Sequence, residues 1–109
     1  MFNIGDMMGK FRDMQERMQH AKEKLNDIIT DAEAGGGMVR VRANANRKVL
    51  SIKIDPEIID KNDPEMLEDL VTAAVNRALD LADAKGREEM QKVTQDLLPP
   101  GMDLGKIGF

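Results

Sequence analysis

The chain has 109 residues, of which 41% are hydrophobic and 33% are charged, so it can form one folded domain and is too apolar for a disordered chain. A formal net charge of −4 excludes a uniformly basic protein, so any surface that attracts nucleic acid must be local. The absence of cysteine excludes disulfides and thiolate metal sites, and no apolar run approaches the about 20 residues of a membrane helix.

The first predicted element is a helix that begins near Ile4, after Asn3 as its N-cap, and frays near Asn26. Its apolar residues recur at the a and d positions of a heptad, here called the heptad stripe: Ile4, Met7, Phe11, Met14, Met18, Ala21, Leu25 and Ile28. Basic residues border the stripe on both sides: Lys10, Arg17, Lys22 and Lys24. The stripe can serve simple packing, but two basic borders would repel each other in a two-stranded coiled coil. An acidic partner surface or phosphate groups would suit these borders better.

Three short strands are expected next. Ile29 and Thr30 favour a short edge strand, and Gly35–Gly37 predicts a flexible turn after it. Residues 38–43 and 49–54 alternate at period two, and the residues between them predict a hairpin turn at 44–47, where asparagine tolerates left-handed dihedrals. This hairpin contains no acid, while five bases fall within it: Arg40, Arg42, Arg47, Lys48 and Lys53.

A second long helix is predicted after Asp63 as N-cap, with Pro64 at its first position. Its apolar face is rich in small residues: Leu67, Leu70, Val71, Ala74, Ala78, Leu81 and Ala82. Gly86 lowers the helix propensity, but Met90, Val93 and Leu97 predict that the helix continues through it, straight or with a bend. Leu98-Pro-Pro-Gly101 stops it, which predicts a single domain over 1–98 and a flexible tail over 99–109. The fold class is therefore α+β, with a helix, a three-stranded antiparallel sheet and a second helix.

Residues for catalysis or metal binding are sparse. The single histidine, His20, stands at a solvent-facing heptad position, and Ser51 has no histidine or lysine at triad spacing. We therefore expect no enzyme activity, no cofactor, no metal and no small-molecule substrate. The first residues lack the basic and apolar regions of a signal peptide, so a cytoplasmic protein is expected.

Four segments carry a pattern that periodicity does not explain: Met14-Gln-Glu-Arg-Met-Gln19, Ile52-Lys-Ile-Asp-Pro-Glu-Ile-Ile59, Glu65-Met-Leu-Glu-Asp-Leu-Val-Thr-Ala-Ala-Val-Asn76 and Leu98-Pro-Pro-Gly-Met102. Together they resemble the YbaB/EbfC family of bacterial nucleoid-associated proteins, almost from end to end. Two positions depart from the family pattern. Asn44 is followed by Ala45 where members usually carry Asn-Gly, and Gly86 falls within a helix that is usually more regular.

The resemblance implies a homodimer whose sheets join at the centre and whose helices project like the arms of tweezers. It also implies binding to double-stranded DNA with little sequence preference, at the nucleoid, with a role in DNA organisation or gene expression. The candidate DNA-contacting residues are Lys10, Arg17, Lys22, Lys24, Arg40, Arg42, Arg47 and Lys48. The small sheet also argues for an obligate dimer, in which the stripe from Leu67 to Ala82 and the apolar face of the hairpin are expected to be buried mainly across the two-fold axis. The alternative is a non-catalytic, protein-binding adaptor that uses the heptad stripe and the acidic second helix.

Overall fold

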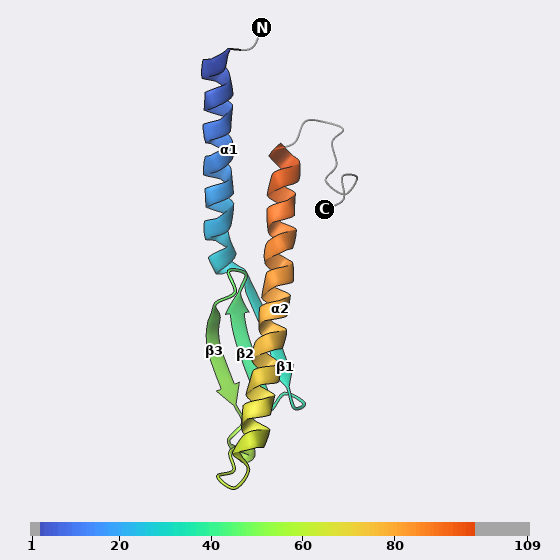
Figure 1. Cartoon of the computed structure of the whole chain (residues 1–109). Helices are drawn as coiled ribbons and strands as arrows, with labels where there is room; N and C mark the ends of the chain where they lie inside the picture. The colour runs from blue at the N-terminus through green and yellow to red at the C-terminus, as the bar shows by residue number, and fades with distance from the viewer. Residues whose placement is uncertain (1–2, 98–109) are drawn as a thin grey trace.

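The computed structural model describes residues 3–97 of the chain. The elements follow in the order α1 (Ile4–Lys24), η1 (Leu25–Asp27), β1 (Ile29–Ala34), β2 (Val39–Asn44), β3 (Val49–Ile54), η2 (Pro56–Ile58) and α2 (Pro64–Leu97) (Figure 1). This confirms the predicted helix, three-stranded antiparallel sheet and helix. Leu98 and the predicted tail over 99–109 lie outside the described residues.

Both helices begin at the predicted caps. The Asn3 side chain accepts a hydrogen bond from the backbone N–H of Gly5 at 2.9 Å, and that of Asp63 accepts one from Met66 at 3.2 Å. These bonds satisfy N–H groups that have no partner within the helix. Pro64 occupies the first position of α2, where its missing N–H costs nothing.

The sheet has the order β1-β2-β3, and α2 packs across one face of β1 and β2. The residues that meet there are small or medium in size and fully or nearly fully buried: Val39, Val41, Ala43, Ala74, Ala78 and Ala82. The three alanines repeat every four residues, so they form one row along α2 and let its backbone lie close to the strands. The row and the β2 residues of the hairpin therefore cover each other within one chain, and the expectation that a two-fold axis mainly buries them is wrong.

Gly86 extends the same row and does not interrupt α2, which is helical from Pro64 to Leu97. A Cβ atom at Gly86 would lie 2.8 Å from the carbonyl oxygen of Ala45, at the tip of the hairpin. The predicted continuation of the helix is thus confirmed, and glycine serves here to let two backbone segments approach each other.

The hairpin turn lies where the sequence predicts it, but its left-handed residue is Arg47, with φ of 61°, and not an asparagine. The Asn44 side chain supports the turn by accepting hydrogen bonds from the backbone N–H groups of Asn46 at 3.0 Å and Lys48 at 3.2 Å. Such side-chain bonds stabilise a turn that lacks glycine at its centre.

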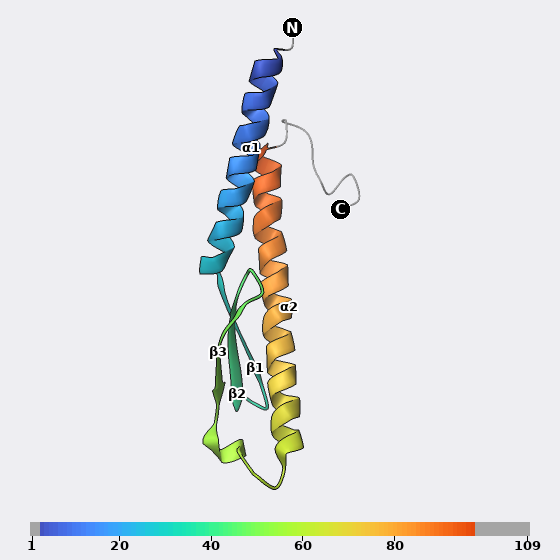
Figure 2. The same ribbon diagram turned by 60° about the vertical axis from the view of Figure 1, so that its left-hand side comes forward.

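Two apolar surfaces remain uncovered in the described chain. The first is β3, which α2 barely reaches and whose Val49, Leu50 and Ile52 are 37% to 46% exposed. The second is the N-terminal part of the heptad stripe. In both views α1 and α2 extend from the same end of the sheet, and the start of α1 reaches past the end of α2 (Figures 1 and 2). Only the C-terminal part of the stripe is covered: Leu25 is buried, and Met18 and Ala21 are half-buried.

Candidate nucleic-acid interface

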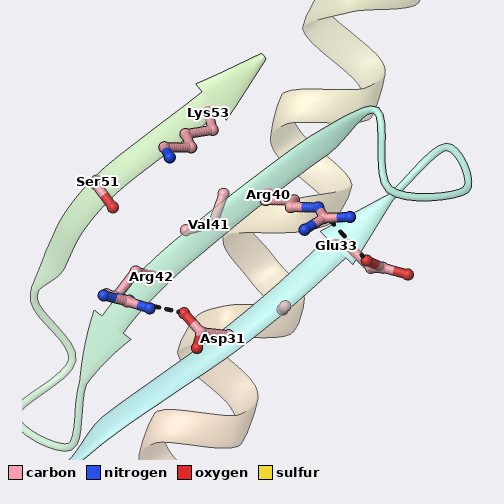
Figure 3. A pocket seen from close by; sticks show the side chains of 8 residues that line it. Asp31, Glu33, Arg40, Val41, Arg42, Ser51 and Lys53 are labelled. Atoms are coloured by element: carbon pink, nitrogen blue, oxygen red, sulfur yellow. Dashed lines mark hydrogen bonds and ion pairs between the residues drawn. The ribbon is translucent and has the colours of Figure 1, made fainter. Parts of the chain in front are cut away.

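On the outer face of the sheet, Arg40 and Arg42 lie opposite two acids of β1, a strand that is not part of the hairpin. In the β1–β2 register Asp31 pairs with Arg42 and Glu33 with Arg40. The Arg42 Nε donates a hydrogen bond to Asp31 Oδ1 at 2.9 Å, whereas the Arg40 Nε lies 3.9 Å from Glu33 Oε2 (Figure 3). The bond to Asp31 raises the pKa of Arg42 above its ordinary value.

A shallow hollow on this face is lined by these four charged residues together with Ser51 and Lys53 (Figure 3). Its walls therefore carry two acids and three bases. The sequence predicts a purely basic hairpin, and the adjoining strand offsets two of the three positive charges on this face. A phosphate at this face would have to compete with carboxylates that already bind the arginines.

The hairpin tip is divided between paired and unpaired cations. Arg47 Nη1 lies 3.6 Å from Asp83 Oδ1 of α2, and the same carboxylate lies 2.9 Å from Arg87 Nη2. Lys48 forms no ion pair within residues 3–97. Within that range the tip thus offers an unpaired cation, Lys48, beside a three-residue charge cluster.

Four of the eight cations that form no ion pair within residues 3–97 lie on α1. Lys10, Lys22 and Lys24 have no ion-pair partner in the described part of the chain, and neither does Arg12. Arg17 pairs with Asp13 at 3.3 Å, but both side chains are more than half exposed. Exposed pairs of this kind contribute about 0–1 kcal/mol, so Arg17 can exchange its partner for a phosphate at little cost. Arg12 is not among the contacts predicted from the sequence, because it lies just outside the two borders of the heptad stripe.

The second helix, α2, is acidic, whereas α1 carries slightly more bases than acids. It carries eight acids and four bases, whereas α1 carries four acids and five bases. Three of the four α2 cations form ion pairs within the helix: Lys85 with Glu88, Arg87 with Asp83, and Lys92 with Glu88 and Glu89. A polyanion would therefore be attracted to α1 and repelled by α2.

His20 is exposed, as predicted, and lines a groove between the two helices with Arg17, Lys24 and Asp96. Neither helix in the described region combines the length and apolar character needed to cross a membrane. Over residues 3–97, no three His, Asp or Glu side chains gather in positions that could hold a metal ion.

Comparison with known proteins gives the family of the chain and a second example of its fold. The chain matches the model of the YbaB/EbfC DNA-binding family over residues 1–97. It is 44% identical over 106 residues to a nucleoid-associated protein of Chlorobium luteolum, covering 97% of this chain and 95% of that protein. A nucleoid-associated protein of Clostridium novyi is 44% identical over 100 residues, covering 92% of this chain and 88% of that protein.

The architecture also matches a solved structure. The crystal structure of an uncharacterized protein from Helicobacter pylori aligns with a TM-score of 0.70 at 21% identity, covering 91% of this chain and all of that chain. This likeness shows the fold alone, and the sequence relationships show the family. The chain belongs to the YbaB/EbfC DNA-binding family.

Proposed function

We propose that this protein is a non-catalytic, nucleoid-associated protein that binds double-stranded DNA as a homodimer, with little sequence preference, and alters DNA organisation. Family membership supports DNA binding, and the nucleoid-associated relatives support a location at the nucleoid. The observation that carries the proposal is the concentration of unpaired cations on α1, a helix that projects from the body of the molecule.

In the proposed mode, cations on α1 neutralise phosphates and release the counterions condensed on DNA. The main contacts are Lys10, Arg12, Arg17, Lys22 and Lys24, with Lys48 at the hairpin tip as a further contact. Arg40, Arg42 and Arg47 contribute less because they lie on the sheet and its hairpin and not on the projecting helix (Figure 1). Contacts to phosphates position a protein on DNA without reading its bases, which accounts for the weak sequence preference.

The uncovered strand β3 supports the homodimer. It is an edge strand with unpaired backbone groups on one side and exposed Val49, Leu50 and Ile52. Pairing of β3 with β3 of a second copy would satisfy these groups and bury these side chains, and it would join the two sheets at the centre. A dimer also doubles the number of basic helices available to one duplex.

A DNA titration at several salt concentrations tests the proposal. Replacing Lys10 and Arg17 by alanine should weaken binding to unrelated duplex sequences. It should also lower the slope of log K against log salt by about 0.9 for each phosphate that the variant no longer neutralises. Replacing Arg40 and Arg42 by alanine should weaken binding less, because these arginines lie on the central sheet, which is less able than a projecting helix to reach a duplex (Figure 1).

Lys92→Ala is the matched control, since it removes a cation that is already bound to acids on α2. We expect this variant to keep the affinity and the salt slope of the natural protein. If the Lys10 and Arg17 changes leave both quantities unaltered, the cations of α1 do not bind DNA, and the adaptor function replaces the proposal.

A further inference from the structure

The N-terminal part of α1 extends beyond the end of α2 (Figures 1 and 2) and carries several exposed apolar side chains. Ile4, Met8 and Phe11 are 60% to 75% exposed, and Met7 is 53% exposed. This segment, residues 4–12, is here called the arm tip. Both views show it beyond the end of α2 (Figures 1 and 2). Apolar residues gathered in this way, and not scattered singly, indicate a binding surface.

The charges beside Phe11 restrict the kind of partner that the arm tip can accept. Lys10 and Arg12 flank Phe11 in sequence, so each lies about 100° away around the helix, one on either side. Neither forms an ion pair within the described residues. A second copy of the heptad stripe would bring the same basic borders together and would be repelled. The fitting partner is apolar at its centre and negatively charged along both edges.

The minor groove of duplex DNA has this arrangement of surfaces. Its floor presents base edges and its walls present sugars, while a phosphate backbone runs along each side. Architectural proteins insert Phe, Met, Leu or Ile side chains between base pairs there and place cations on the flanking phosphates. Met side chains are flexible and fit irregular apolar gaps, which suits a partly opened base step.

We propose that the arm tip is a DNA wedge: Phe11, supported by Met8, enters the minor groove and partly unstacks a base step, while Lys10 and Arg12 contact the phosphates on its two sides. This inference rests on the proposed function and adds a mode of contact to it. It implies that the protein underwinds the duplex to which it binds. It also implies a preference for pyrimidine–purine steps, because these steps unstack most easily.

The test compares Phe11→Ala with Ile59→Ala in the full chain. Ile59 is a matched control because it is 58% exposed and lies between β3 and α2, away from the arm tip. Phe11→Ala should bind a short random-sequence duplex about tenfold more weakly, which is the usual effect of removing one aromatic side chain that stacks on a base. Its salt slope should stay unchanged, because an apolar side chain releases no counterions. Ile59→Ala should behave like the natural protein.

A second measurement detects the unwinding of DNA that the wedge should cause. Closed circular plasmid is relaxed by a topoisomerase with saturating protein, and its linking number is measured after the protein is removed. The natural protein and Ile59→Ala should lower the linking number, whereas Phe11→Ala at saturation should lose most of this effect.

Three outcomes overturn the wedge. They are no linking-number change with the natural protein, no difference between the natural protein and Phe11→Ala, or a change of molar mass in light scattering caused by Phe11→Ala. The last would mark the arm tip as a protein–protein interface. A joint replacement of Lys10 and Arg12 by alanine separates the two proposals. If it lowers the salt slope while Phe11→Ala has no effect, only the wedge fails; if it leaves the slope unchanged, DNA binding by the arm tip fails as well.

Discussion

Gly9 and Gly86 both lie inside helices, yet their surroundings are opposite. A Cβ atom at Gly9 would meet nothing within 4 Å, whereas one at Gly86 would lie 2.8 Å from the backbone oxygen of Ala45. That oxygen belongs to a turn fixed by hydrogen bonds and cannot easily move. The same substitution should therefore have opposite effects on stability at the two positions.

We predict that Gly9→Ala raises the free energy of unfolding by up to about 1 kcal/mol, through helix propensity alone. Gly86→Ala gains the same propensity but incurs an overpacking cost of about 1–3 kcal/mol, so it should lower the free energy of unfolding. Urea denaturation of both variants measures the difference. Equal stabilisation by the two changes would show that Ala45 and Gly86 are not in close contact.

At the scale of elements, the hairpin tip holds the end of α1. The backbone N–H of Ala45 donates to the carbonyl oxygens of Leu25 at 3.2 Å and Ile28 at 2.9 Å. The Asn46 side-chain amide donates to the carbonyl oxygen of Lys22 at 3.2 Å and to Asn26 Oδ1 at 2.6 Å. These carbonyl groups lie at or just beyond the helix end, where intrahelical partners run out. Because none of the residues of α1 itself is buried, these bonds have a large share in setting its direction.

Asn46→Ala removes both side-chain bonds and should lower the free energy of unfolding by about 1 kcal/mol, given the usual net value of exposed hydrogen bonds. Amide hydrogen exchange should accelerate from Lys22 to Ile28, while the amides shared by β1 and β2 keep their protection. Asn76→Ala, an exposed asparagine on α2 with no side-chain hydrogen bond in the described region, is the control. Uniform loss of protection across the sheet would contradict a local role for Asn46.

The elements that follow from the sequence are those encoded by neighbouring residues. Both helix starts, the hairpin and the shared face of Val39 and Val41 are confirmed because caps, turns and periodicity are local signals. The family resemblance is confirmed as well. The role of Gly86 and the acids opposite Arg40 and Arg42 escape such analysis, because each depends on a segment distant in sequence. Which cations contact DNA, and whether two copies associate, stay predictions.

For the whole molecule, the open apolar surface of β3 predicts a stable dimer. Light scattering at micromolar concentration should give twice the chain mass of 12.2 kDa. Ile52→Lys places a charge on the surface that we expect two copies to bury, so it should shift the mass toward the monomer at the same concentration.

Ile4→Lys serves as the control for this prediction, because it introduces the same charge at an apolar residue that is 75% exposed on α1. It should leave the dimer intact. A natural protein that scatters as a monomer would refute the dimer, and dissociation by Ile4→Lys alone would move the interface from β3 to α1.

The row of small residues on α2 also determines how far this helix can slide along the sheet. Because Ala74, Ala78 and Ala82 repeat at every turn, a shift by one turn would replace two of the three alanines by another alanine, so the row by itself fixes the axial position only weakly. The two ends of the row differ. A Cβ atom at Gly35 would lie 3.1 Å from the Leu70 side chain, and Gly86 admits the carbonyl group of Ala45. A one-turn shift would bring Ala82 or Met90 against that carbonyl, so the packing at these two ends sets the height of α2 relative to the sheet.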